Sequence, residues 1–545
     1  MKLPFRPRTR IVLSTITVLL GSVLFFTTRT MCACGPETSE AMAANTIAEG
    51  QSGKAVDLAP ETVLAKLQLQ DNQPPLEITL QQLMETYKVP GLSVAVIENY
   101  QIAWAKGFGV TEFGGAKPVT TKTLFQAGSI SKPVAAVGAM WLVEQGKLSL
   151  DEDVNKKLKS WKVPENDFTK EQKVTLRRLM SHSGGLTVHG FPGYAANEPR
   201  PTLVQIFNGA KPANTAPIRV DFVPGSKMRY SGGGVTIEQQ LMIDVTGEPF
   251  PRFMQQTVLS KAGMTDSSYE QPLPPARAAL TATGTRADGR SVEGRWHIYP
   301  EMAAAGLWTT PTDLAKFAIE IALSKQGKAN HVLTQKSVQE MLTPQIKSEE
   351  NDGTSVGLAF FLGEGQDPNQ FGHNGADEGF QALLTMNSES GRGIAIMGNS
   401  DAFFHVAPYA VEAVERARGW KTAGQPHPAI DAVSLLYATR GMDTALNAYA
   451  RLKQGGIPGY AKPNEATLNS LGYMLMGGKK LDDAIKVFER NVQEYPQGWN
   501  CYDSLAEAYM NAGKKDLAIK NYEKSLALNP ENKNGAETLK KLKAQ

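Results

Sequence analysis

The feature that most constrains the fold is a 34-residue period near the C-terminus. Pro496 and Pro530 are 34 residues apart, and small residues recur in the same register beside an aromatic position. A small residue lets two antiparallel helices approach, and the aromatic ring fills the space between them. Stacked helical hairpins are therefore predicted, and such stacks need about three units for stability. The matched pairs are Leu471/Leu505, Gly472/Ala506, Ala484/Ala518, Ile485/Ile519 and Phe488/Tyr522.

These units resemble tetratricopeptide repeats. A degenerate copy around Ala445 to Leu452 and a final helix from Asn534 to Ala544 are predicted to flank the two regular ones. Two prolines in Gly424 to Pro428 indicate a linker over residues 421–432, so the repeats are predicted over residues 433–545. Arrays of this kind bind partner proteins, cover a domain face or mediate self-association, and no ligand motif decides between these roles. We expect a protein partner.

The N-terminus is typical of an exported protein. Basic residues precede an apolar run from Ile11 to Phe26, and small residues at Ala41-Met42-Ala43 could end a cleavable signal. Residues 1–30 are predicted to be a signal peptide or an N-terminal membrane anchor, which places the rest in the periplasm or outside the cell. Residues 31–75 are polar and lack apolar periodicity, so they are predicted to be a flexible linker.

Composition excludes several function classes. The chain is 41% hydrophobic and 20% charged, which is ordinary for a folded protein. A net charge of +3 without a dense Lys/Arg stripe argues against nucleic-acid binding. Three cysteines, two of them in the leader region, make no disulfide framework. Paired Cys-x-x-Cys, His-Glu-x-x-His and phosphate-binding glycine motifs do not occur in the sequence, so no metal or cofactor is expected.

Residues 76–420 are predicted to form an α/β domain. Strand-like runs lie near both ends, and the middle reads as helices and long loops, beginning with a helix from Ser131 to Gln145. This order predicts an antiparallel sheet with flanking helices and a helical insert. The strand-like runs are Leu92 to Ile97, Ile102 to Ala105, Gly357 to Leu362, Phe380 to Asn387 and Gly393 to Asn399.

The start of the predicted helix carries a candidate nucleophile. Ser129 and Lys132 are three residues apart, which places both on one face of a helical turn. A serine hydroxyl is a weak nucleophile and needs such a neighbouring base. Free N–H groups at the helix start would also favour a developing oxyanion. A single Ser-x-x-Lys is weak evidence, because an N-capping serine followed by an exposed lysine gives the same pattern.

Two further segments strengthen the catalytic interpretation. Tyr230 stands on a glycine-rich turn before a predicted helix from Val235 to Val245. The segment Phe371 to Ala376, which contains His373, comes just before the strand that starts at Phe380. Taken separately, a turn tyrosine usually packs and a histidine beside glycine is usually a loop residue.

In this order, the three segments resemble the penicillin-recognising serine hydrolases, specifically their class C β-lactamase-like branch. The resemblance covers about Leu76 to Arg418 and implies the β-lactamase/transpeptidase-like fold. It implies that Ser129 forms an acyl-enzyme and that Lys132 and Tyr230 share proton transfer. It also implies that the amides of Ser129 and Ala376 bind the oxyanion, and that His373 and Gly375 line the substrate site. Three more segments take part in it: Thr175 to Leu186, Val245 to Gly247 and Gly306 to Thr310.

Two departures from the family pattern bear on the substrate. The β-lactamases and D-Ala-D-Ala peptidases have Tyr-x-Asn and Lys-Thr-Gly, whereas this chain has Tyr230-Ser231-Gly232 and His373-Asn374-Gly375. A fixed ammonium is thereby replaced by a group that is mostly neutral at pH 7. His-x-Gly versions resemble the esterase and D-amino-acid amidase or peptidase members, so an ester, an amide or a D-amino-acid peptide is the expected substrate. A β-lactamase, a D-Ala-D-Ala carboxypeptidase and a catalytically silent envelope-binding protein are the alternatives.

Overall fold

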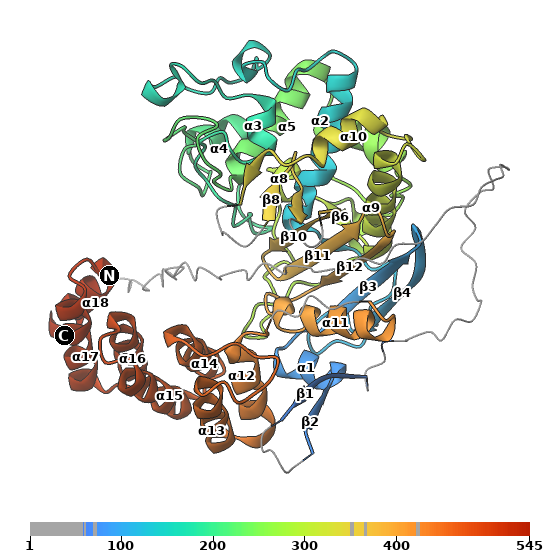
Figure 1. The fold of residues 1–545 in the computed structure, drawn as a ribbon. Helices are drawn as coiled ribbons and strands as arrows, with labels where there is room; N and C mark the ends of the chain where they lie inside the picture. The colour runs from blue at the N-terminus through green and yellow to red at the C-terminus, as the bar shows by residue number, and fades with distance from the viewer. Residues whose placement is uncertain are drawn as a thin grey trace, which may run out of the picture.

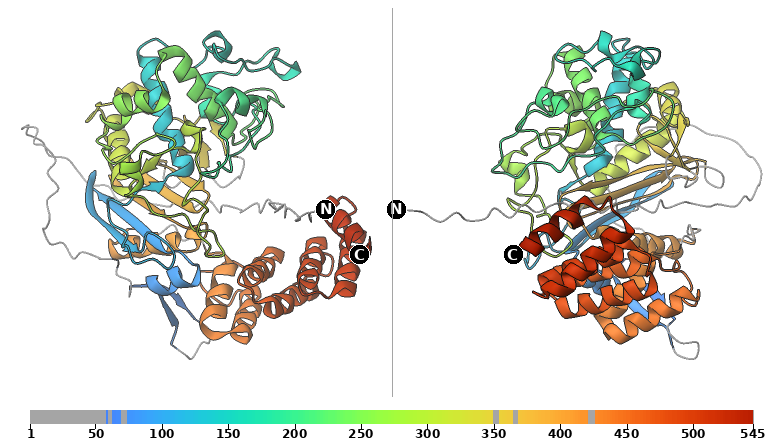
Figure 2. Two further views of the ribbon diagram at one scale, coloured as in Figure 1. Left: turned by 180° about the vertical axis from the view of Figure 1, so that it is seen from behind. Right: turned by 90° about the vertical axis from the view of Figure 1, so that its left-hand side faces the viewer.

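The computed structural model describes residues 58, 62–68, 74–348, 354–363, 368–420 and 426–544. The predicted leader, together with Cys32 and Cys34, lies outside these residues. Figures 1 and 2 show an α/β body and a helical arm that extends from its lower side. Within the described ranges, no helix is long and apolar enough to cross a membrane.

An eight-stranded antiparallel sheet forms the centre of the body. The sheet's first strand in sequence, β3 (Gly91–Glu98), pairs with its last, β12 (Arg392–Gly398), so segments about 300 residues apart in sequence lie side by side. In spatial order the strands are β4 (Gln101–Gly109), β3 (Gly91–Glu98), β12 (Arg392–Gly398), β11 (Phe380–Asn387), β10 (Gln370–Asp377), β9 (Phe361–Gly363), β8 (Thr354–Val356) and β7 (Ile346–Lys347).

Both faces of the sheet are covered by helices (Figure 1). Ala95 and Ile97 of β3 belong to the core that includes α9 (Pro311–Lys325), whereas Val94 and Val96 belong to the core that includes α11 (Ala407–Ala417). Successive side chains of a strand point to opposite faces, so a strand buried on both faces is apolar throughout. This explains the continuous apolar run of β3.

The strand predictions were correct except near the third run. The run predicted from Gly357 to Leu362 was wrong, because residues 357–360 make the turn between β8 and β9. Within that turn Ala359 has a positive φ of 65°, and its amide donates to the carbonyl of Met180. The sequence analysis places Phe371 to Ala376 just before a strand, whereas in the structure this segment is itself a strand, β10.

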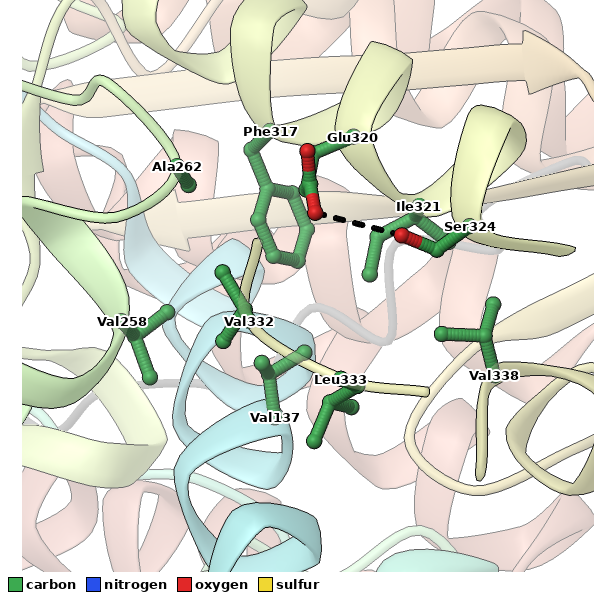
Figure 3. Close-up of a pocket in the computed structure, with 10 residues that line it drawn as sticks. All are labelled: Val137, Val258, Ala262, Phe317, Glu320, Ile321, Ser324, Val332, Leu333 and Val338. Carbon is green, nitrogen blue, oxygen red and sulfur yellow. Dashed lines mark hydrogen bonds between the residues drawn. The ribbon is translucent and has the colours of Figure 1, made fainter. Parts of the chain in front are cut away.

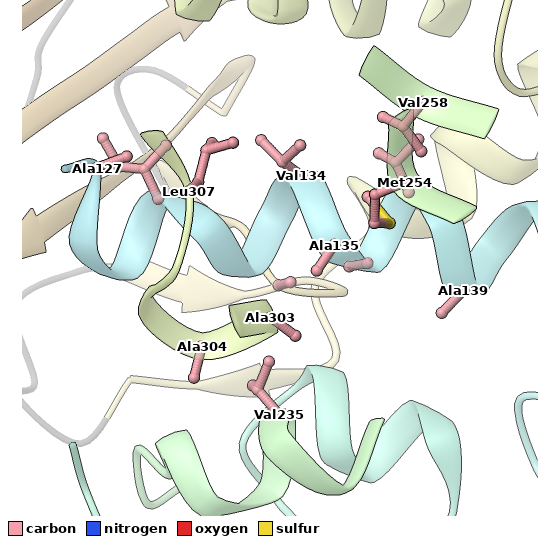
Figure 4. Packing of buried hydrophobic residues seen from close by; sticks show 14 of the residues in the cluster. Ala127, Val134, Ala135, Ala139, Val235, Met254, Val258, Ala303, Ala304 and Leu307 are labelled. Atoms are coloured by element: carbon pink, nitrogen blue, oxygen red, sulfur yellow. The ribbon is translucent and has the colours of Figure 1, made fainter. Parts of the chain in front are cut away.

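The helical insert covers one end of the sheet and is built around α2 (Ser131–Glu144). Eleven of its fourteen residues are buried, because α5, α6 and α8 surround it (Figure 4). A helix buried on all sides has no polar face. The other elements are α3 (Leu176–Met180), α4 (Leu203–Asn208), α5 (Gly232–Thr246), α6 (Phe250–Met254), α7 (Pro275–Ala278), α8 (Met302–Ala305), α10 (Gln335–Met341), the short helical segments η1 (Gly128–Ile130), η2 (Val154–Lys156), η3 (Asp167–Thr169) and η4 (Gln255–Leu259), and a separate two-stranded antiparallel sheet of β5 (Phe125–Gln126) and β6 (Trp308–Thr309).

The arm consists of helical hairpins with the predicted packing. A Cβ added to Gly472 would lie 2.4 Å from the ring of Phe488, so only glycine fits there. Ala506 and Ala518 are fully buried in the next hairpin. The helices are α12 (Ala429–Arg440), α13 (Met442–Lys453), α14 (Glu465–Gly477), α15 (Leu481–Glu494), α16 (Trp499–Asn511), α17 (Lys515–Leu528) and α18 (Lys533–Ala544).

Both predicted linkers need correction. β1 (Val63–Leu67) lies inside the predicted linker 31–75 and pairs with β2 (Leu76–Thr79), because its leucines are buried against the sheet-side core. α12 begins at Ala429, inside the predicted linker 421–432. Five or six residues are too few to show a period, so these contacts were not visible in the sequence.

The arm and the body share one hydrophobic core that runs from the sheet through α11 and α12. Polar contacts reinforce this junction where α1 (Leu80–Thr86) and η5 (Phe403–His405) meet α12. Tyr87 shares a hydrogen bond of 2.7 Å with Ser434, and His405 Nδ1 lies 2.7 Å from the Asp431 carboxylate. The arm is therefore packed on the body.

Candidate active site

Ser129 lies on η1, the tight turn that leads from β5 into α2. Gly128 before it has a φ of +50°, and a Cβ there would lie 2.3 Å from the amide nitrogen of Ala376. Only glycine tolerates both the conformation and the approach. The turn is thereby pressed against β10, and the Ser129 side chain remains partly exposed.

Lys132 is 2% exposed and its ammonium nitrogen points at the serine. Lys132 Nζ lies 2.8 Å from Ser129 Oγ and 2.8 Å from the carbonyl oxygen of Ala304. Burial lowers the pKa of Lys132 from 10.5 to about 7, against an opposing effect of Asp377. A lysine with such a pKa is partly neutral at pH 7 and can accept a proton.

Tyr230 completes a group of three around the serine oxygen. Its hydroxyl is hydrogen-bonded to Ser129, and burial raises its pKa well above 10. The Lys132 ammonium nitrogen lies 5.0 Å from the centre of its ring. The tyrosine is therefore protonated at neutral pH and can pass on a proton only in exchange for another.

A cluster of rings holds Tyr230 in place. The ring of His182 lies 4.2 Å from that of Tyr230, and its Nδ1 accepts a hydrogen bond from the Ser231 amide. His189 and Phe361 lie against the same ring, at 4.9 and 6.4 Å between centroids. Sequence reasoning did not find these contacts, because Tyr230 and Phe361 are far in sequence from the loop that carries both histidines.

β10 supplies the opposite wall. The buried positions of β10 alternate along the strand. A Cβ on Gly375 would lie 1.9 Å from the carbonyl oxygen of Ala127. Because Gly375 has no side chain, the strand packs directly on η1 at this point. Burial lowers the pKa of His373 to about 3, which keeps this ring neutral. Ala376 is exposed, and its amide is beside the Ser129 turn. All six predicted site residues are thus brought to one place.

The apolar pocket in Figure 3 is separate from this site. It lies between α2, η4 and α9, and Val137, Phe317 and Leu333 are among its lining residues. Its polar groups are paired with one another, since the Ser324 hydroxyl donates to Glu320. Among the residues that the structure places, no group of three His, Cys, Asp or Glu side chains is arranged to hold a metal ion.

Comparison with known proteins identifies the class. The beta-lactamase family model matches residues 76–417, which is more than half of the chain, and the chain therefore belongs to this family. A tetratricopeptide repeat model matches residues 499–532 in the arm. The resemblance inferred from the three segments is confirmed, as is the predicted fold class.

Individual relatives are distant. The chain is 27% identical over 245 residues to a beta-lactamase of Pseudomonas fluorescens, which covers 44% of this chain and 62% of that protein. It is 26% identical over 247 residues to a beta-lactamase of Escherichia coli K12, at 44% and 58% coverage. The match therefore spans less than two thirds of the length of each of these two relatives. The octameric penicillin-binding protein homologue of Pyrococcus abyssi has a similar fold, with a TM-score of 0.53 and 23% identity over 63% of this chain and 76% of that one.

Proposed function

We propose that this protein is a serine hydrolase that forms an acyl-enzyme at Ser129 and acts on an uncharged ester, an amide or a D-amino-acid peptide. The observation that carries the proposal is the 2.8 Å contact between Lys132 Nζ and Ser129 Oγ inside a buried site. A lysine that served only as a surface charge would not be 2% exposed with a pKa near 7.

The geometry supports a proton path through two groups. Neutral Lys132 takes the proton of Ser129 as its oxygen attacks the substrate carbonyl, and the amides of Ser129 and Ala376 stabilise the oxyanion. Tyr230 donates its proton to the leaving group and is reprotonated from Lys132. Water then attacks the acyl-enzyme by the reverse of these steps.

The surroundings of Gly232 support an uncharged substrate. Its amide donates to the carbonyl of His189 at 2.9 Å, and a Cβ on Gly232 would lie 3.0 Å from that oxygen and 3.1 Å from the ring of Phe191. The loop that carries His189 thus leaves little room for a side chain at position 232. The family's ammonium is replaced by neutral His373, so this site lacks both groups that hold a charged β-lactam or D-Ala-D-Ala substrate.

The nucleophile assignment is tested with a fluorophosphonate probe on the full chain. We expect labelling of the wild type, no labelling of Ser129→Ala, and full labelling of Ser149→Ala, which alters an exposed serine of the same domain. Equal labelling of all three would refute the assignment. A wild type that is not labelled would favour the catalytically silent envelope-binding protein.

The substrate class is tested with a panel of a short nitrophenyl ester, D-amino-acid amides, D-alanyl peptides and a chromogenic cephalosporin. We expect ester or amide turnover to exceed cephalosporin turnover. Gly232→Asn is not expected to create cephalosporin hydrolysis, because the loop leaves little room for the new side chain. Cephalosporin turnover as fast as ester turnover in the wild type would favour the β-lactamase alternative, and fast release of D-alanine would favour the carboxypeptidase.

We further propose that the protein is exported and that the arm binds a protein partner. The basic and apolar pattern of residues 1–30 supports export, with the leader either cleaved or kept as a membrane anchor. The tetratricopeptide match supports the partner. Cell fractionation combined with N-terminal sequencing tests the first proposal. Crosslinking of the intact protein, compared with a chain that ends after α11, tests the second.

A further inference from the structure

The buried face of β10 carries one side chain, that of Asp377, that the proposed chemistry does not use. His373, Gly375 and Asp377 occupy alternate positions of β10 and therefore share this face. Asp377 is 7% exposed. Its carboxyl group accepts a hydrogen bond from the backbone amide of Gly128. The oxygen Oδ2 has no hydrogen-bond partner among the described residues. A buried carboxyl in this state needs an explanation.

We propose that Asp377 is a positioning residue that ties the Ser129 turn to β10 and thereby holds the amides of Ser129 and Ala376 as a pair. Gly128 comes immediately before Ser129, and Asp377 comes immediately after Ala376. A hydrogen bond between these two flanking residues therefore joins the two short segments that carry the oxyanion donors. The contact between Gly128 and Ala376 itself involves no side chain of Gly128, so it supplies close packing without a directional bond.

The charges around Asp377 fit this role. Lys132 of α2 lowers its pKa, Glu301 before α8 raises it, and burial raises it most, so the net pKa is well above its ordinary value. Tyr299 also faces the group, and burial keeps that phenol protonated. Burial therefore favours the neutral acid over the carboxylate at this position. An ionised carboxylate in this place would hold Lys132 in its charged form, whereas a neutral acid positions the turn and leaves Lys132 able to act as base.

The test compares Asp377→Ala with Asp377→Asn in the full chain. The asparagine is neutral like the protonated acid, and its side-chain oxygen can still accept from the Gly128 amide. For Asp377→Ala we expect kcat on a nitrophenyl ester and the fluorophosphonate labelling rate to fall about 10- to 100-fold, somewhat less than the loss of a whole oxyanion donor. KM should stay within about threefold, since the substrate pocket is unchanged, and Asp377→Asn should keep kcat within about threefold of the wild type.

Asp401→Ala is the matched control. Asp401 is also a buried carboxyl that accepts from a backbone amide, that of Gly379 at 2.6 Å, but it lies beyond the turn between β10 and β11. The Asp401→Ala variant should have a lower melting temperature than the wild type but should not show the fall in kcat expected for Asp377→Ala. An equal loss of kcat in both alanine variants would overturn the inference, because it would show a general effect of removing a buried carboxyl in this region.

The inference rests on the proposed function, and the two fail differently. An unlabelled wild type refutes the function, whereas a labelled wild type with Asp377→Ala at the same rate refutes only the role of Asp377. Equal losses in the alanine and asparagine variants would also refute it. If Asp377→Ala does not fold, Asp377→Ser replaces it, because its shorter side chain does not reach the Gly128 amide, and the same loss is expected.

Discussion

Replacing Lys132 by methionine should abolish acylation and yet make the protein more stable near pH 6. Lys132 is held in a buried site that lowers its pKa from 10.5 to about 7. This difference corresponds to roughly 5 kcal/mol by which the folded state disfavours the protonated lysine. Methionine has a similar length and carries no charge, so it removes this cost.

The loss of hydrogen bonds offsets part of the gain. Ser129 Oγ is partly exposed and can bond to water, but the carbonyl of Ala304 loses its buried donor, which costs about 1–3 kcal/mol. A net stabilisation of about 2–4 kcal/mol remains. For a domain of about 345 residues, it corresponds to an increase in melting temperature of roughly 3–6 °C.

The pH dependence provides the discriminating result. Below pH 7 both the folded and the unfolded wild type bind the proton, so the full cost of Lys132 is present. Between about 7 and 10.5 only the unfolded state binds it, and wild-type stability rises with pH. The advantage of Lys132→Met should therefore shrink over this range and reverse near pH 10.5, where only the lost hydrogen bonds remain.

The measurement is urea unfolding at pH 6, 8 and 10, with Lys147→Met as the control at an exposed lysine of the same domain. The control should differ from wild type by less than about 0.5 kcal/mol at each pH. A Lys132→Met protein that is less stable than wild type at pH 6, or that differs from it by the same amount at each pH, would refute the reasoning.

Three more outcomes are expected. Nitrophenyl-ester turnover should rise about tenfold per pH unit below a midpoint near 7, because Lys132 must be neutral to act as base; a flat profile from pH 5 to 8 would contradict this role. Gly375→Ala should slow fluorophosphonate labelling more than tenfold, since the new Cβ would lie 1.9 Å from the oxygen of Ala127 and force β10 away; wild-type labelling would show that the close approach is dispensable. Gly472→Leu should destabilise the arm by about 1–3 kcal/mol through overpacking against Phe488, seen as faster proteolysis of α14 and α15, and resistance equal to wild type would contradict the tight packing.

The sequence predicted those parts of the protein in which local pattern and burial coincide. The 34-residue period predicted the helical hairpins, because each repeat places the same small and aromatic residues at the same interface. β3, β11 and β12 were visible because their apolar runs are buried on both faces. The spacing and order of Ser129, Lys132, Tyr230 and His373 sufficed to indicate the family, which the comparison confirms.

Only the tertiary structure decided the features that depend on contacts between distant segments. β10 contains two glycines, a histidine and an asparagine, and it is a strand because β9 and β11 pair with it on both sides. The hydrogen bond between Asp377 and Gly128 joins residues almost 250 positions apart. Burial by surrounding helices sets the pKa of Lys132 near 7, which the sequence cannot show. The sequence by itself determined which groups are present and in what order, and the packing of distant segments determined their charge and their distances.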